Sequence, residues 1–142
     1  MPTSKATATW KGGLEGGTGE YGAGSGSFEG GYTAATRFEG KSGSNPEELL
    51  AAAHASCFSM ALAANLEKAG NPPESITTAA HCTLEMQEDG PKITTMKLVV
   101  QGKVPGVDPA AFAGAAQEAK NNCPVSKALM KNLEVELEAK LA

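Results

Sequence analysis

The order of apolar and polar positions divides the first third of the chain into alternating stretches around a glycine-rich segment. Residues 3–11 alternate small or polar side chains with Thr, Ala and Trp, and residues 31–38 continue in the same way, so both predict strands. Between them, residues 12–31 are about half glycine. This segment suits a linker. Because Tyr21 and Phe28 recur in it, a pair of short twisted strands with glycine turns is the better interpretation.

Residues 45–70 carry the start and stop signals of a long helix. Asn45 suits the N-cap, Pro46 suits the first helical position, and two glutamates follow where the helix dipole favours acidic groups. Gly70, followed by Asn-Pro-Pro, ends the pattern.

The middle of this helix, residues 49–66, has no charged side chain. A helix that is apolar on every side must be covered on every side, which is difficult for a small domain alone. One arrangement packs it against a second copy of itself in a homodimer, and its many Ala and Ser residues would allow close approach. In the alternative arrangement, the sheet covers one side of the helix and the helices of residues 109–131 cover the opposite side. We favour the homodimer.

The second half of the chain predicts a hairpin, two helices and a last strand. Strands over 75–87 and 92–104 flank an Asp-Gly turn, so we expect them to pair antiparallel. A helix over 109–121 breaks at Asn-Cys-Pro, a short helix runs to about Lys131, and residues 133–141 alternate as a half-exposed strand. The elements predict an α+β fold in a single domain over residues 1–142.

Composition excludes several classes of function. The chain is 41% hydrophobic with a formal charge of −4 and has no run of basic residues, so we expect no nucleic-acid partner. We find neither the apolar core of a signal peptide nor a stretch long enough to span a bilayer, and we expect a cytoplasmic protein without a membrane partner. Three scattered cysteines and two histidines make a structural zinc site unexpected.

The cysteines are the candidates for chemistry. Cys57 lies inside the apolar helix, where it is either a small buried hydrophobe or a reactive thiol that needs an external cation. Arg37 is the only arginine, and guanidinium stays charged when desolvated, so it is the obvious cation. Cys123 precedes a proline at a helix start, where backbone N–H groups lower a thiol pKa. Cys82, next to His81 in a strand, is expected to be structural.

Two residues of the long helix bear on the surroundings of Cys57. Glu47 precedes it by ten residues, about 15 Å along the axis, so Glu47 can serve the same site only through Arg37 or from a partner subunit. His54 precedes it by three residues and shares its face, which allows a Cys–His pair for acyl transfer. A packed or interfacial histidine is the favoured interpretation of His54.

Two motifs resemble the OsmC/Ohr family, named for osmotically inducible protein C and organic hydroperoxide resistance. These are TRFEGKSGSNPEELLAAAHASCFSMAL (residues 36–62) and CPVSKAL (residues 123–129). The first is closer to the OsmC branch than to the Ohr branch, and the order of elements extends the resemblance over essentially the whole chain. The resemblance implies antiparallel sheets wrapped around long central helices in an intertwined homodimer.

The resemblance also implies a cysteine-based peroxidase that reduces organic hydroperoxides and hydrogen peroxide without metal, haem or flavin, in defence against oxidative stress. On the matching positions, Cys57 is the peroxidatic cysteine, Cys123 is the resolving cysteine, and Arg37 and Glu47 are the activating pair. A disulfide between the two cysteines is then reopened by a small dithiol, lipoyl-type or other.

Apolar neighbours would favour alkyl or lipid peroxides as substrates, and the candidate substrate-binding residues are Leu49, Phe58, Met60 and Phe112. Two other functions remain open at this point. One is a non-enzymatic dimer of the same fold that binds a small molecule or lipid. The other is acyl transfer by the Cys–His pair.

Overall fold

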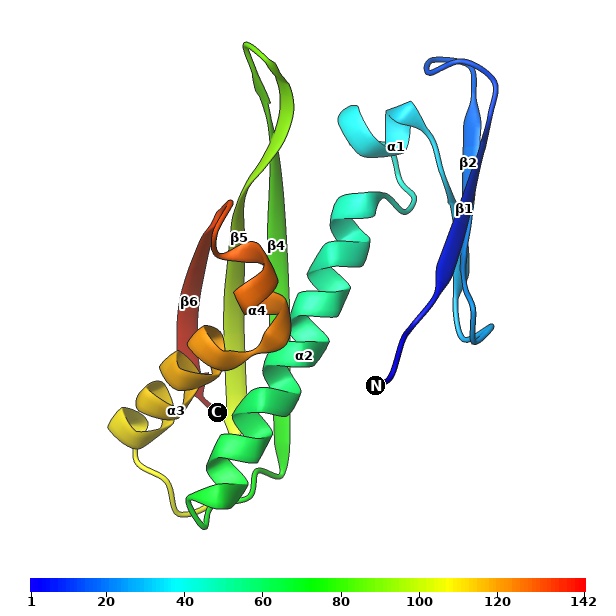
Figure 1. Ribbon diagram of the computed structural model, residues 1–142. Coiled ribbons are helices and arrows are strands. Elements are labelled where there is room, and N and C mark those ends of the chain that lie inside the picture. Colours follow the sequence, from blue (N-terminus) through cyan, green and yellow to red (C-terminus); the bar gives the residue numbers. More distant parts are fainter. The chain divides into compact units, whose positions relative to one another are not determined.

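The computed structural model describes residues 1–142 and has the predicted α+β class (Figure 1). In chain order the elements are β1 (Ala6–Lys11), β2 (Thr18–Ala23), β3 (Glu29–Tyr32), α1 (Ala34–Phe38), α2 (Pro46–Lys68), β4 (Ser75–Gln87), β5 (Gly90–Lys103), α3 (Pro109–Asn122), α4 (Pro124–Leu129) and β6 (Glu134–Leu141). The chain divides into two compact units, an N-terminal unit (Met1–Leu49) and a C-terminal unit (Leu50–Ala142). The single domain stays a prediction.

The glycine-rich segment forms strands, as predicted, and not a linker. In the N-terminal unit β1, β2 and β3 make an antiparallel sheet in that order. Gly19 lies under two aromatic rings, Trp10 and Tyr32, whose centroids are 5.5 Å apart. A β-carbon at this position would collide with both rings, so the glycine allows the aromatic side chains to lie across the sheet.

The predicted strand over residues 31–38 is wrong beyond Tyr32, because the chain turns into the short helix α1. Thr33 caps this helix: its hydroxyl accepts a hydrogen bond from the Thr36 N–H (3.1 Å), and its own N–H donates to the Thr36 hydroxyl (3.0 Å). This reciprocal capping satisfies two backbone donors at the helix start. It places Arg37 in the last turn of α1.

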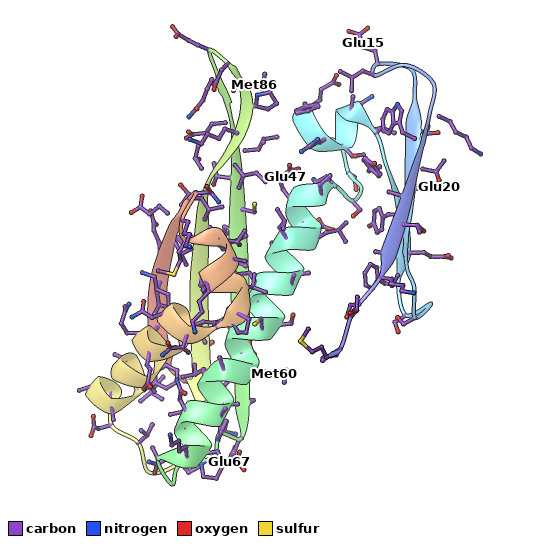
Figure 2. All side chains as sticks on the ribbon, in the orientation of Figure 1. Glu15, Glu20, Glu47, Met60, Glu67 and Met86 are labelled. Carbon is purple, nitrogen blue, oxygen red and sulfur yellow. The ribbon has the colours of Figure 1, made fainter.

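Helix α2 has the predicted boundaries. The Asn45 side-chain oxygen accepts a hydrogen bond from the Glu48 N–H (2.8 Å) at its start, and Gly70 takes a positive φ of 89° after its end. One face of the helix is buried, with Phe58, Leu62 and Leu66 in the core. The opposite face carries Met60, which is 76% exposed (Figure 2).

By length and composition alone, α2 could cross a membrane, since its most apolar window has a mean hydropathy of 1.5. The expectation that no stretch reaches this length is therefore wrong. Core helices of globular domains meet the same criterion, and the buried face of α2 contributes three large side chains to the core of the C-terminal unit.

The C-terminal unit contains the predicted hairpin and last strand, with one difference in topology. Strands β4 and β5 pair antiparallel around a turn in which Gln87 faces Gly90, and Gly90 has a φ of 118°. Strand β6, however, pairs parallel with β5, so this sheet is mixed and not wholly antiparallel. Parallel neighbours need a crossover connection, and α3 and α4 supply it. Helix α4 ends at Leu129, two residues before the predicted end.

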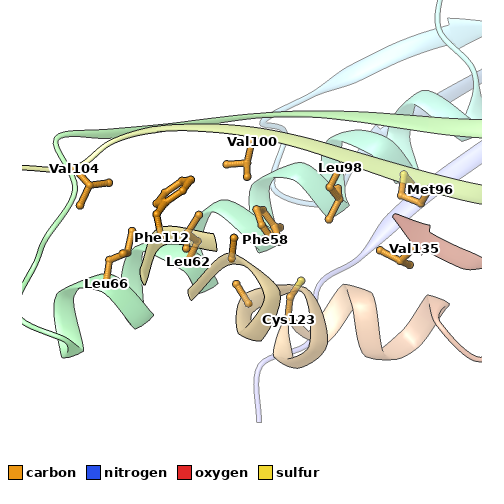
Figure 3. Packing of buried hydrophobic residues seen from close by; sticks show 12 residues of the cluster. Phe58, Leu62, Leu66, Met96, Leu98, Val100, Val104, Phe112, Cys123 and Val135 are labelled. Atoms are coloured by element: carbon orange, nitrogen blue, oxygen red, sulfur yellow. The ribbon is translucent and has the colours of Figure 1, made fainter. Parts of the chain in front are cut away.

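Helices α2, α3 and α4 lie on one face of the β4–β5–β6 sheet and enclose the core (Figures 1 and 3). The core side chains are Phe58, Leu62, Leu66, Met96, Leu98, Val100, Val104, Phe112, Ala116, Ala119, Cys123 and Val135. Phe112 of α3 reaches the sheet at Gly102 of β5, where a β-carbon would lie 2.5 Å from its ring. The glycine lets the ring lie directly on the strand.

Gly102→Ala should therefore destabilise the C-terminal unit. The new methyl group meets a ring that is only 1% exposed and has no room to move, so we expect a loss of roughly 1–3 kcal/mol in the free energy of unfolding. Urea denaturation followed by circular dichroism measures it. Gly114→Ala is the control, because its β-carbon would meet no atom within 4 Å. Equal stability of the two variants would contradict this packing of Phe112 on Gly102.

Candidate functional site

Two thiols meet between α2 and the start of α4. The Cys123 thiol donates a hydrogen bond to the Cys57 sulfur, with 3.0 Å between the two Sγ atoms. They are not joined by a disulfide. Cys57 is half-buried, whereas Cys123 is completely buried in the core (Figure 3). The structure thus brings together the two cysteines that the sequence singled out from distant parts of the chain.

The break between α3 and α4 explains the position of Cys123. This residue is at once the C-cap of α3 and the N-cap of α4, with extended backbone angles (φ −55°, ψ 127°). Its N–H donates to the carbonyl of Ala119 (2.9 Å), which completes α3, and Pro124 opens α4. The non-helical residue at the corner turns its side chain toward α2.

The surroundings of Cys57 in the C-terminal unit disfavour the thiolate. Burial raises the pKa of the Cys57 thiol, and the adjacent Cys123 acts in the same direction. The backbone N–H of Val125 opposes them by hydrogen bonding to Cys57. The sequence predicts that such helix-start N–H groups act on Cys123, whereas in the structure the Val125 N–H acts on Cys57. A positive charge from elsewhere is still needed to form a thiolate at Cys57.

Arg37 and Glu47 form an ion pair within the N-terminal unit. The Nη2 atom of Arg37 lies 2.8 Å from Oε1 of Glu47, and its Nε atom donates to the same carboxylate at 3.1 and 3.3 Å. The Glu47 side chain is 8% exposed and that of Arg37 is 34% exposed. This bidentate geometry holds the guanidinium in one orientation. Glu47 therefore contacts Arg37, which is one of the two routes by which it could serve the same site as Cys57.

A pocket of about 310 Å³ opens beside Arg37 in the same unit. Its walls are mainly apolar and come from Trp10, Leu14, Tyr32, Thr33, Ala34, Arg37 and Phe38. The guanidinium carbon of Arg37 lies 5.3 Å from the centre of the Phe38 ring, within the range of a cation–π contact. This pocket was not predicted from the sequence. Its aromatic side chains, Trp10, Tyr32 and Phe38, are far apart in the sequence, and only the sheet register brings Trp10 and Tyr32 together.

The four predicted substrate-binding residues have different environments. Phe58 and Phe112 are 0% and 1% exposed and pack in the core, whereas Leu49 is half-buried and Met60 is exposed. Packing in the core is sufficient to explain the two large phenylalanine side chains without a role in substrate binding. Substrate binding by these four residues stays a prediction.

His54 is fully buried and hydrogen-bonds across to α4. Its Nε2 atom lies 2.7 Å from the hydroxyl of Ser126, while its Nδ1 atom has no partner. An unpaired N–H is rarer in protein interiors than an unpaired acceptor, so we assign the proton to Nε2, which donates to Ser126. The imidazole does not bond to Cys57, which disfavours the acyl-transfer alternative. The packed-histidine interpretation agrees with this geometry.

Cys82 and His81, for which the sequence predicts a structural role, lie on β4. The side chain of Cys82 is half-buried and that of His81 is exposed, as expected for adjacent residues on opposite faces of a strand. No group of three or more His, Cys, Asp or Glu side chains is arranged to hold a metal ion.

Comparison with known proteins assigns the family. The model of the OsmC-like protein family matches residues 39–138, a range that includes Glu47, Cys57 and Cys123. The chain is 42% identical to peroxiredoxin OsmC of Escherichia coli over 137 residues, which cover 96% of both chains. The chain belongs to the OsmC-like family.

Solved structures of the same family share the fold. An organic hydroperoxide resistance protein from Elizabethkingia anophelis superposes with a TM-score of 0.82 at 27% identity and covers 100% of this chain and 98% of its own. The organic hydroperoxide resistance protein OhrB of Bacillus subtilis gives a TM-score of 0.75 at 28% identity, covering 95% and 97%. The mixed second sheet therefore belongs to an architecture already seen in crystals.

The burial of His54 predicts a dependence of stability on pH. Burial lowers the pKa of His54 from 6.5, so just below pH 6.5 the unfolded chain binds a proton that the folded chain does not. The free energy of unfolding should fall as the pH falls below 6.5. His54→Gln removes this contribution, and urea denaturation at pH 7.5 and 5.5 should show a smaller loss in the variant than in the parent. Equal losses would show that His54 does not contribute.

Proposed function

We propose that this protein is a cysteine-based peroxidase that reduces organic hydroperoxides and hydrogen peroxide through a sulfenic acid on Cys57, which Cys123 resolves as a disulfide. The observation that carries the proposal is the 3.0 Å contact between the two sulfur atoms. The family relationship supports it, because the relative with 42% identity is named a peroxiredoxin.

In the first step, the Cys57 thiolate attacks the distal oxygen of the peroxide. The O–O bond breaks, the sulfur is oxidised to a sulfenic acid, and the other oxygen leaves as an alcohol or water after taking a proton. Arg37 would supply the positive charge that the thiolate lacks within its own surroundings, and Glu47 would hold the guanidinium in its bidentate orientation.

In the second step, the Cys123 thiol condenses with the sulfenic acid. The S–O bond breaks, the S–S bond forms, and the hydroxyl leaves as water with the proton of Cys123. No further oxidant is required. Cys123 already lies against Cys57, so this step needs only a small movement of the two side chains. A dithiol, lipoyl-type or other, then reduces the disulfide and restores both thiols.

The proposal includes a homodimer with its active sites at the subunit interface. Its support is the exposed face of α2, which carries Ala52, Ser56, Met60 and Ala64 and no charged residue. An uncharged helix face of this length is unusual on a solvent-exposed surface, and packing against a second copy would cover it. We further propose that the dimer acts in the cytoplasm.

The preferred substrates would be organic hydroperoxides. The pocket beside Arg37 offers apolar walls from Trp10, Tyr32 and Phe38 next to a single cation. An alkyl chain suits the walls, and the polar peroxide group suits the guanidinium. The two crystal structures with related folds are named organic hydroperoxide resistance proteins, which agrees with this substrate class.

Reduced protein treated with cumene hydroperoxide should lose two thiols per chain. Peptide mapping should then find Cys57 joined to Cys123, while Cys82 stays reduced. Cys57→Ser should abolish peroxide consumption, and Cys123→Ser should allow a single turnover that leaves a sulfenic acid on Cys57. An unchanged thiol count in the parent would contradict the peroxidase and favour a binding protein of the same fold.

Glu47→Gln should weaken catalysis by loosening Arg37. The variant keeps the size of the side chain but loses charge-assisted hydrogen bonds, so we expect kcat/KM for cumene hydroperoxide to fall roughly ten- to a hundredfold. Steady-state kinetics with excess dithiol measures this. Glu74→Gln is the matched control, because it removes the same charge from an exposed pair with Lys103. Similar kinetics in the two variants would argue against an activating role for Glu47.

A further inference from the structure

Helices α2 and α4 meet through two polar contacts, which lie one helical turn apart along each helix. The first is the contact between Cys57 and Cys123, and the second is the hydrogen bond between His54 and Ser126. His54 precedes Cys57 by three residues, and Ser126 follows Cys123 by three. Residues at this spacing lie on one face of a helix, so the second contact holds the same two faces together as the first.

The His54–Ser126 contact has the features of a fixed connection. Both side chains are 0% exposed, and the two atoms are 2.7 Å apart. If α4 moved away, a buried imidazole N–H and a hydroxyl would lose their partners, which is costly in an apolar core. Helix α4 has only six residues, too few for a helix to hold its own place without such contacts.

The proposed steps leave this pair without a role. His54 does not contact either sulfur through a hydrogen bond, since Nε2 is used by Ser126 and Nδ1 has no partner. The pair cannot therefore transfer a proton directly to the reacting atoms. Its effect on the chemistry has to come from where it holds α4.

We infer that His54 and Ser126 are positioning residues for the second step of the cycle, which hold the Cys123 thiol against Cys57 without affecting attack on the peroxide. This inference rests on the proposed function for its place in a catalytic cycle. The positioning itself concerns the two thiols alone, so it can be measured without any peroxide.

The test uses Ellman's reagent on reduced protein that carries Cys82→Ser. The half-exposed Cys57 reacts first, forms a mixed disulfide and releases one nitrothiobenzoate anion. The Cys123 thiolate then attacks the Cys57 sulfur of this mixed disulfide, which forms the Cys57–Cys123 bond and releases a second anion. Stopped-flow absorbance separates the two releases, and the second rate reports how well Cys123 is positioned.

Ser126→Ala should leave the first release within about twofold of the parent and slow the second roughly 5- to 100-fold, the range expected for one unpaired buried group. His54→Met should behave in the same way. His54→Gln, which keeps a donor near the position of Nε2, should recover much of the second rate. Ser59→Ala is the matched control, because it removes a hydroxyl of α2 that bonds to Thr78 (2.7 Å) away from α4, and both its rates should equal those of the parent.

A second release that is as fast in Ser126→Ala as in Ser59→Ala would overturn the inference. So would an equal slowing of both releases, which marks a general loss of structure. If His54→Met does not fold, the Ser126→Ala result decides alone. A parallel experiment with cumene hydroperoxide tests the proposed function separately: no peroxide consumption by the parent would refute the peroxidase, while the Ellman rates would still decide the positioning role.

Discussion

The need to cover α2 governs the arrangement of the C-terminal unit. A helix with no charge over residues 49–66 must bury what it can, and its Phe58, Leu62 and Leu66 face supplies the centre of the core. The sheet and the α3–α4 crossover close over that face, and Cys123 enters the core with them. Hydrophobic packing of the helices on the sheet thus brings the two thiols together.

The same burial sets a conflict between stability and reactivity. A thiol in this environment is protected from water, but its pKa is raised, and a raised pKa suppresses the nucleophilic form. The chain contains one guanidinium, Arg37, and it is held by a nearly buried carboxylate and not left to move in solvent. A permanently charged, oriented cation is the kind of group that can reverse the effect of burial on the pKa of a thiol.

Local signals in the sequence were sufficient for most elements, and they singled out the two cysteines that meet in the structure. Asn45, Pro46 and Gly70 mark α2 because caps act on neighbouring residues. Helix α1, which Thr33 caps, was predicted as part of a strand because so short a helix has too few residues to show a helical period. The parallel pairing of β6 could not be predicted, since alternation in one strand does not identify its partner. The His54–Ser126 bond was missed for the same reason, as its two ends lie 72 residues apart.

The parallel pairing of β6 with β5 also limits how this chain can change in evolution. The segment from Lys103 to Glu134 has to carry the chain back from the end of β5 to the level of Thr95 before β6 can begin. Cys123 lies inside this return path, so an insertion or deletion there would move the thiol and shift the register of β6 at the same time. The parallel pairing in the sheet and the position of the second cysteine therefore depend on the same segment of the chain.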